Sequence, residues 1–370
     1  MHVGMGAIFQ NPEDERSDRD VYADDLRLID LAEPLGFESV WGVEHHFTDY
    51  TMCPDVLQFL TWAAARTQKI QVGSMVVVLP WHDPVRVAEE VSMLDNMSGG
   101  RLIFGIGRGL GRVEFNGFRV PMDESRARFV ESAQMILRGL EHGFLEYDGK
   151  YVKQPRVAIR PKPFKSFRGR TYAAAVSPES SRIMAELGIG ILIIPQKPWD
   201  QVEAELADYR RVYRDVNGAD APPPIVAGWT FCDESPERAR EMAVRYIGGY
   251  WKTVIKHYEL KGDHLMKTIG YESYGRMQEL ISGGAESALT EFFLDLQIWG
   301  TPEQCVEKIR DRLGRTGGES YVAIFSYAGM SFPDAERSMR LFAREVLPEL
   351  KSSPIPKRAS TGAAAATAAS

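Results

Sequence analysis

The sequence IQVGSMVVVL (Ile70–Leu79) is followed directly by Asp83-Pro84 and an amphipathic stretch that closes at Gly99-Gly100. The first part is a continuous apolar run rich in valine, as expected for a strand buried on both faces of a parallel sheet. Aspartate before proline is typical of a helix start, and paired glycines are typical of a helix end. The stretch therefore predicts a strand followed by a helix, the repeating unit of α/β folds.

The same alternation continues outward in both directions. Ser177-Pro178-Glu179 opens a helix that stops at Gly188, and Thr301-Pro302-Glu303 opens another that ends near Gly314. Because eight strands are what a closed barrel needs, we predict a single TIM-type (β/α)₈ barrel over residues 1–350, rather than an open doubly wound sheet. The predicted strands are His2–Phe9, Ser39–Val43, Ile70–Leu79, Arg101–Ile106, Thr171–Val176, Ile189–Ile194, Ile225–Phe231 and Tyr321–Ser326.

Three segments depart from this rhythm. Asp148-Gly149 predicts a hairpin turn within residues 143–170. Residues 248–298 form a long aromatic insertion before the last strand, which we interpret either as a lid over the active site or as a helical excursion that covers the barrel or contacts another subunit. Residues 351–370 end in STGAAAATAAS and predict a disordered tail.

Composition excludes several classes of protein. The formal net charge of −7 argues against nucleic acid or an anionic membrane as a partner. The three cysteines, Cys53, Cys232 and Cys305, are far apart, so the sequence indicates neither a disulfide framework nor a metal site. No signal peptide and no run of roughly 20 apolar residues is present, which predicts a cytoplasmic protein without a membrane segment.

Polar residues that follow predicted strands are candidates for the active site, because the carboxyl ends of barrel strands carry it. His45 and His46 follow the second strand, and neighbouring residues of a strand point to opposite sides, so at most one of them faces the barrel mouth. Three consecutive residues, Glu44 to His46, cannot all chelate one metal ion from an extended strand. A histidine at the mouth suits proton transfer, and a purely structural histidine is the alternative.

A second set of candidates predicts an anion site. Gly107-Arg108-Gly109 follows the fourth strand, where glycines allow close backbone approach and the arginine offers a fork for phosphate. Ser177 opens a helix, and helix N-termini bind anions, although serine before Pro-Glu is also an ordinary cap. With Arg126, these residues outline a locally basic pocket in an acidic protein. The GxGxxG dinucleotide motif is not met.

In sequence order, these residues resemble the bacterial luciferase family of flavin-dependent monooxygenases. The most specific segments are Glu44-His45-His46-Phe47-Thr48, Leu79-Pro80 with Asp83-Pro84-Val85-Arg86, and Leu94-Asp95 with Met97-Ser98-Gly99-Gly100-Arg101. The run from Gly105 to Leu110, with Glu114-Phe115 and Ser125-Arg126-Ala127, is closer still to the luciferase α subunit. The likeness extends from the first strand to Leu347-Pro348.

The resemblance implies a barrel that binds reduced FMN (FMNH₂), supplied by a separate flavin reductase, and that activates O₂ as a flavin C4a-hydroperoxide to oxygenate a small organic substrate. His45 matches the catalytic histidine, and Met75 and Val76 match a segment with a non-proline cis peptide behind the flavin ring. The phosphate-binding residues are matched by Arg108, Arg126, Ser177 and Ser180. The resemblance also implies a dimer, formed through helices flanking strands two and three, and leaves homodimer and heterodimer open.

The sequence departs from the luciferase α subunit at two positions. Gly107 stands where that subunit has a reactive cysteine, and Gly111 stands where it has a tyrosine, so light emission is not expected. Two alternatives stay open: a deazaflavin (F420)-dependent hydride-transfer enzyme of the same superfamily, and a non-catalytic partner subunit of a luciferase-type heterodimer. The substrate cannot be inferred from the sequence, although Trp41, Trp81, Trp229, Trp251 and Phe231 would suit either an aromatic pocket or the barrel core.

Overall fold

Eight apolar runs of the sequence pair side by side and close into a parallel barrel. The computed structural model describes residues 1–174 and 178–352. The strands are β1 (His2–Ala7), β2 (Ser39–Gly42), β3 (Gln71–Ser74), β4 (Val77–Val78), β5 (Leu102–Gly107), β6 (Phe144–Asp148), β7 (Lys153–Ala158), β8 (Thr171–Ala174), β9 (Gly190–Ile193), β10 (Ile225–Cys232), β11 (Ile298–Gly300) and β12 (Ser320–Ile324). The ring runs β1, β2, β3, β5, β8, β9, β10, β12 and back to β1, all parallel. The predicted (β/α)₈ barrel is confirmed.

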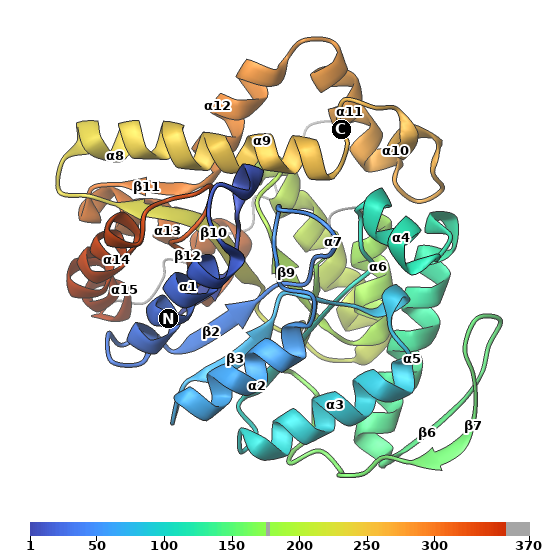
Figure 1. Ribbon diagram of the computed structural model, residues 1–370. Helices are drawn as coiled ribbons and strands as arrows, with labels where there is room; N and C mark the ends of the chain where they lie inside the picture. The colour runs from blue at the N-terminus through green and yellow to red at the C-terminus, as the bar shows by residue number, and fades with distance from the viewer. Residues whose placement is uncertain (175–177, 353–370) are drawn as a thin grey trace, which may run out of the picture.

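Helices surround this ring (Figure 1). The α-helices are α1 (Asp18–Ala32), α2 (Val56–Arg66), α3 (Pro84–Met97), α4 (Arg112–Phe118), α5 (Ser125–His142), α6 (Pro178–Leu187), α7 (Trp199–Asn217), α8 (Pro236–Met242), α9 (Gly248–His257), α10 (His264–Lys267), α11 (Glu272–Ser282), α12 (Glu286–Leu296), α13 (Pro302–Thr316), α14 (Phe332–Leu341) and α15 (Leu347–Ser352). Short 3₁₀ turns at Pro12–Asp14, Leu79–Trp81 and Met122–Glu124, and π-helical turns at Ala243–Ile247 and Phe342–Val346, complete the helical segments.

The local signals act as the sequence predicts at the helix ends. Asp83 caps α3 by accepting a hydrogen bond from the backbone N–H of Val85 at 2.8 Å. Thr301 forms a capping box with Gln304 at the start of α13. That helix passes the predicted end near Gly314 and continues to Thr316, because Gly317 rather than Gly314 takes the left-handed φ of 62° that ends it.

The strands differ from the prediction in two places. The run Ile70–Leu79 is divided into β3 and β4, and between them the backbone N–H of Met75 bonds to the carbonyl of Gly42. The short strand β11 was missed, since its three residues lie directly after α12 and pair with the end of β10 outside the ring. A three-residue strand carries too little alternation to be distinguished from a loop.

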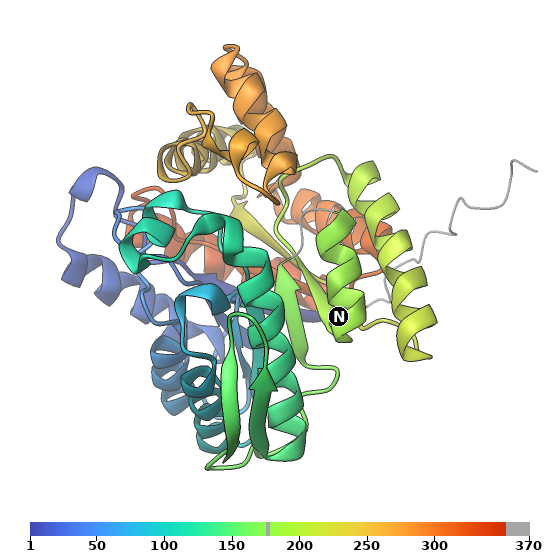
Figure 2. The ribbon, with the colours of Figure 1, turned by 90° about the vertical axis from the view of Figure 1, so that its right-hand side faces the viewer.

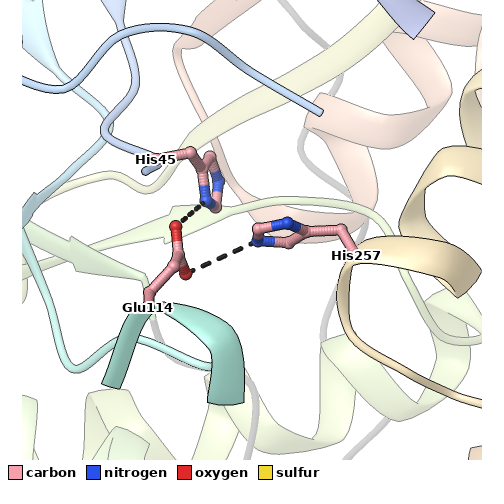
Figure 3. A group of neighbouring side chains, drawn as sticks. All are labelled: His45, Glu114 and His257. Atoms are coloured by element: carbon pink, nitrogen blue, oxygen red, sulfur yellow. Dashed lines mark hydrogen bonds and ion pairs between the residues drawn. The ribbon is translucent and has the colours of Figure 1, made fainter. Parts of the chain in front are cut away.

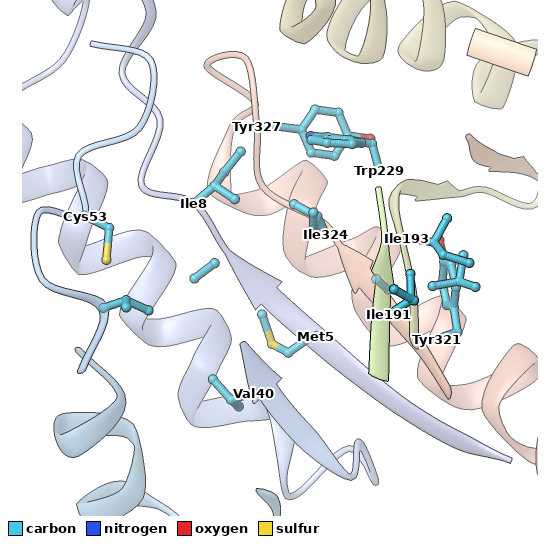
Figure 4. Packing of buried hydrophobic residues seen from close by; sticks show 14 of the residues in the cluster. Met5, Ile8, Val40, Cys53, Ile191, Ile193, Trp229, Tyr321, Ile324 and Tyr327 are labelled. Carbon is cyan, nitrogen blue, oxygen red and sulfur yellow. The ribbon is translucent and has the colours of Figure 1, made fainter. Parts of the chain in front are cut away.

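Two buried layers hold the barrel together. The larger layer lies between strands and helices and includes Met5, Val40 and Ile191 (Figure 4). The smaller one fills the barrel itself, with Trp41 as its largest side chain, together with Ile103, Tyr172, Leu192 and Val322. Adjacent residues Val40 and Trp41 thus point to opposite faces of one strand, as the pleat requires. A side-chain carbon at Gly73 would lie 2.4 Å from the Trp41 ring, so only glycine leaves room for it.

Residues 248–298 form the helices α9 to α12, which lie across one end of the barrel (Figures 1 and 2). The hairpin of β6 and β7 projects at the opposite end, as Figure 2 shows. Its turn follows the predicted Asp148-Gly149, and the Glu131 carboxylate accepts hydrogen bonds from the backbone of residues 150–152. Lys351 and Ser352 belong to α15, and the rest of the predicted tail lies outside the described residues.

The described helices were compared in length and hydropathy with what a membrane span requires. None of them is both long enough and apolar enough to cross a bilayer.

A buried ion pair explains part of the Leu94-Asp95 motif. The Asp95 carboxylate is fully buried near the end of α3. It accepts bidentate hydrogen bonds from the Arg170 guanidinium, at 2.6 and 2.9 Å. The same carboxylate accepts the backbone N–H groups of Phe164 and Lys165, so it fastens the segment that leads into β8.

Replacement of Asp95 by alanine is therefore expected to lower the free energy of unfolding by about 3–5 kcal/mol, because it leaves the largely buried Arg170 without its partner. Urea unfolding at neutral pH measures this. The matched control is Glu90→Ala, which breaks the exposed Arg86–Glu90 pair of the same helix and should cost less than about 1 kcal/mol. Similar losses of stability in the two variants would show that burial does not strengthen the Asp95–Arg170 ion pair.

Candidate active site

A cavity opens at the carboxyl end of the barrel strands, on the side covered by the insertion. Its volume is about 1090 Å³, including space open to solvent. Six of the seven predicted site residues line it: His45, Met75, Val76, Arg108, Arg126 and Ser180. The seventh, Ser177, lies outside the described residues. The remaining lining residues are Glu44, Val78, Trp81, Gly107, Gly109, Leu110, Glu114, Phe129, Ala174, Ile183, Met184, Leu192, Ile194, Gln196, Tyr258 and Tyr274.

His45 reaches this cavity from the loop after β2. Its Nδ1 lies 2.9 Å from Oε1 of Glu114, and the same oxygen accepts the backbone N–H of His46 at 2.9 Å. Glu114 lies on α4, a short helix that follows the glycine-rich loop after β5. The His45 ring is therefore held from one side by a buried carboxylate, and it remains partly exposed.

The His46 side chain points away from the cavity and contacts a buried carboxylate. Its Nε2 lies 3.1 Å from Oε1 of the buried Glu44, and His82 Nε2 lies 2.7 Å from the same oxygen. Burial alone would raise the pKa of Glu44, but the hydrogen bonds from His46 and His82 outweigh it and lower that pKa overall. The Glu44 carboxylate also accepts the backbone N–H of Val78, which secures β4. Of the two histidines only His45 lines the cavity, although both lie beyond the end of β2 at Gly42 and not on the strand.

Glu114 joins two histidines that come from distant parts of the chain (Figure 3). Its second oxygen, Oε2, lies 3.5 Å from Nε2 of His257, the last residue of α9. Burial opposes ionisation of Glu114, yet the charges and hydrogen bonds of His45 and His257 lower its pKa to about 2. Burial lowers the pKa of His257, so this ring is neutral at neutral pH.

The donor atoms of His45, Glu114 and His257 all lie within 4.8 Å of one another, a set that a metal ion could bind. Metal–ligand bonds to these atoms are about 2.0–2.2 Å long, with the imidazole nitrogens unprotonated. Here His45 Nδ1 instead contacts the Glu114 carboxylate directly at hydrogen-bond distance. We interpret the group as a network in which His45 hydrogen-bonds to Glu114 and His257 faces the second oxygen of that carboxylate at 3.5 Å.

One wall of the cavity is apolar and very closely packed. The peptide bond between Met75 and Val76 is cis, as the resemblance implied. A side-chain carbon added at Gly107 would lie only 2.3 Å from Cγ2 of Val76. The glycine at the position of the luciferase cysteine is therefore matched to the valine beside it.

Gly107→Cys is accordingly expected to cost about 1–3 kcal/mol of stability, because it overpacks this wall. Val76→Ala in the same chain should recover most of that loss, since it removes the clashing methyl group. A double-mutant cycle from urea unfolding measures the coupling. Strictly additive effects would contradict the close packing of Gly107 against Val76.

The opposite side of the cavity is cationic. Arg108 and Arg126 both donate to the carbonyl oxygen of Gly270, at 2.7 and 3.2 Å. Arg126 also pairs with Glu179 at the start of α6, and the Arg108 guanidinium lies 3.9 Å from the centre of the Tyr271 ring. The two predicted arginines thus converge on Gly270 of the insertion, and Arg126 also contacts α6. Ser180, also on α6, lines the same side.

Sequence reasoning missed the roles of Glu114 and His257. Glu114 was noticed only as part of a family-like segment, and His257 only as one residue of a long insertion. No local pattern connects them to His45. Of the aromatic residues proposed for the substrate pocket, Trp81 lines the cavity and Trp41 lies in the barrel interior, whereas Trp229, Trp251 and Phe231 are buried in the larger core, where Trp229 packs on Tyr250 of the insertion.

A closed parallel barrel with a histidine and two converging arginines around a cavity at its carboxyl end defines an α/β-barrel protein. The chain belongs to the luciferase-like monooxygenase family, whose model matches residues 1–320. It is 27% identical over 333 residues to the alkanal monooxygenase alpha chain of Photorhabdus luminescens, covering 88% of this chain and 91% of that one.

Solved structures agree with this assignment. The monooxygenase RslO1 from Streptomyces bottropensis superimposes with a TM-score of 0.80 at 27% identity, covering 94% of this chain and 99% of that one. The coenzyme F420-dependent tetrahydromethanopterin reductase from Methanopyrus kandleri has a TM-score of 0.64 at 23% identity, covering 95% and 100% of the two chains. The second likeness concerns the fold alone.

Proposed function

We propose that the protein is an FMNH₂-dependent monooxygenase of the two-component kind, which uses O₂ to oxygenate a small organic substrate. The observation that carries this proposal is the single cavity with His45 on one side and Arg108 and Arg126 on another. The names of two relatives, an alkanal monooxygenase and a monooxygenase, support the reaction type. A separate flavin reductase would supply the reduced cofactor.

The residues of the cavity fit FMN in their chemistry. FMN is an apolar ring system that carries a phosphate on a polar chain. Two guanidinium groups that converge on one acceptor, the Gly270 carbonyl, suit that phosphate. The wall made by Met75, Val76 and Gly107 suits the ring, because its exposed side chains are apolar and closely packed.

In this proposal, each part of the cavity has one task. Arg108, Arg126, Ser177 and Ser180 hold the phosphate, and the N-terminus of α6 adds its partial positive charge. Met75 and Val76 support the ring. When bound, the reduced flavin supplies the electrons that activate O₂. His45 takes up or delivers a proton at its Nε2, while the helices α9 to α12 act as a lid that limits access of water.

Equilibrium binding of FMN and of F420, followed by flavin fluorescence, tests the choice of cofactor. We expect FMN to bind more tightly than F420. Tighter binding of F420 would favour the hydride-transfer enzyme, and binding of neither would favour the non-catalytic partner subunit.

We further propose that two copies of the chain pair through α2 and α3, the helices that flank β2 and β3. Met93 and Met97 are both more than half exposed on α3 and provide apolar surface for such a contact. Sedimentation equilibrium should therefore give twice the chain mass of 41.5 kDa. A monomer at micromolar concentration would contradict this pairing.

A further inference from the structure

The hydrogen-bonded network around Glu114 links the barrel to the insertion. His45 comes from the loop after β2, Glu114 from α4, and His257 from the end of α9, and Figure 3 shows the carboxylate between the two rings. Glu114 is fully buried, and His257 nearly so. A buried carboxylate that faces two imidazoles therefore lies at the junction of three separate segments.

The protons in this network can be assigned from its chemistry. Glu114 is ionised, because its pKa is lowered to about 2 by the two histidines, against the effect of burial. A carboxylate can only accept hydrogen bonds, so the nitrogens that face it must carry hydrogens. In the neutral ring of His45 this places the hydrogen on Nδ1 and leaves the lone pair on Nε2.

His257 is fixed in the same manner from its other side. Its Nδ1 lies 2.9 Å from the hydroxyl of Thr48, and that hydroxyl accepts the backbone N–H of Tyr50. The hydroxyl hydrogen is thereby available to His257 Nδ1, which leaves the hydrogen of the neutral ring on Nε2, 3.5 Å from Oε2 of Glu114. The Tyr50 ring stacks on His257, with ring centres 4.4 Å apart.

Space for this pairing exists because residue 111 has no side chain. A carbon added to Gly111 would lie 2.3 Å from Oε2 of Glu114 and 3.1 Å from Nε2 of His257. The backbone of Gly111 has a φ of −71°, which any residue can adopt. A side chain at position 111 would therefore displace the Glu114 carboxylate from its place beside His257.

We propose that Glu114 and His257 are positioning residues, which hold His45 in the tautomer whose Nε2 can accept a proton, and that the insertion takes part through His257. The proton chemistry of His45 rests on the proposed function, whereas the tautomer does not. Position 111 thus decides whether a chain of this kind can form the network.

The other ionisable groups around the network do not compete for this role. Burial raises the pKa of Tyr50 to about 12 and that of Tyr258 well above its usual value, so both phenols stay neutral. Glu44 is satisfied by His46 and His82. Two ion pairs nearer the surface, Asp49–Lys256 and Arg112–Glu259, flank the network.

The test is the tautomer of His45, read from ¹⁵N chemical shifts of histidine-labelled protein, with the resonance assigned by loss in His45→Asn. In the unmodified chain we expect a protonated Nδ1. Glu114→Leu removes the acceptor and should convert His45 mainly to the Nε2-protonated form that free histidine favours. Glu114→Gln keeps an acceptor oxygen and should retain much of the original tautomer.

Further variants test whether the insertion influences the His45 tautomer. His257→Phe removes the donor, and Gly111→Ala pushes Glu114 away from His257; both should give a mixture of His45 tautomers. His257→Gln restores an N–H near the Nε2 position and should reduce that mixture. The control is Arg112→Gln. It removes the surface ion pair between Arg112 of α4 and Glu259, which follows α9, and should leave the tautomer unchanged.

The proposal would be overturned by a protonated Nε2 on His45 in the unmodified chain. It would also be overturned if Glu114→Leu and Gly111→Ala kept the protonated Nδ1 while remaining folded, as judged by unfolding curves. A tautomer shift with Arg112→Gln equal to that with His257→Phe would reduce His257 to a structural contact. None of these spectra requires a flavin, so failure of the cofactor assignment leaves the test intact.

Discussion

Replacement of His45 by asparagine is expected to lower the rate of product formation by about 10²–10⁴-fold, the usual worth of a positioned acid or base. Asparagine keeps a donor near the position of Nδ1, so the contact with Glu114 can persist, but it has no group that titrates in place of Nε2. Affinity for FMN should change little, because the phosphate-binding arginines lie elsewhere on the cavity wall. A substrate found by screening aldehydes, ketones, alkanes and heterocycles provides the assay.

The control for this experiment is His142→Asn, at the far end of α5 and outside the cavity. It should leave both product formation and FMN affinity unchanged. If His45→Asn forms product as fast as the unmodified chain, His45 is not part of the mechanism. A loss of FMN binding equal to the loss of rate would instead make His45 a cofactor ligand.

The second large effect is expected at the cationic side of the cavity. Hydrogen bonds to charged groups contribute about 1.5–3 kcal/mol each, so Arg108→Met together with Arg126→Met should weaken FMN binding by about 10²–10⁴-fold. Riboflavin lacks the phosphate, and its affinity should change much less. Fluorescence titration with the two flavins measures the difference directly.

Arg128→Met is the matched control, since Arg128 lies on α5 with Arg126 but pairs with Glu124 instead of lining the cavity. Its FMN affinity should equal that of the unmodified chain. Equal losses of FMN and riboflavin binding in the double variant would show that these arginines maintain the shape of the cavity and do not recognise phosphate.

The fold could be predicted because its signals are local. The valine-rich run Ile70–Leu79 and the caps at Asp83 and Thr301 each specify an element from a few neighbouring residues. The ends of helices are harder to predict from local signals. Gly314 predicts the end of α13, but a glycine inside a helix is tolerated when a better stop, here Gly317, follows.

The candidate site could be predicted where a residue follows a strand, or where the resemblance supplied it, as for Arg126 on α5 and Ser180 on α6. His45, Val76 and Arg108 follow strands, and the barrel brings them together. Glu114 and His257 lie on helices, and their meeting depends on how the insertion packs over the barrel. No period or motif of one sequence encodes that contact, because it is decided by tertiary packing.

Stopped-flow absorbance is the most direct test of the central claim. Anaerobic protein with bound FMNH₂ is mixed with oxygenated buffer, after FMNH₂ binding has been verified separately. We expect oxidised FMN to appear only after a marked delay relative to free FMNH₂, and we expect added substrate to shorten this delay. Immediate formation of oxidised FMN, at the rate of the free cofactor, would contradict a monooxygenase function for this cavity.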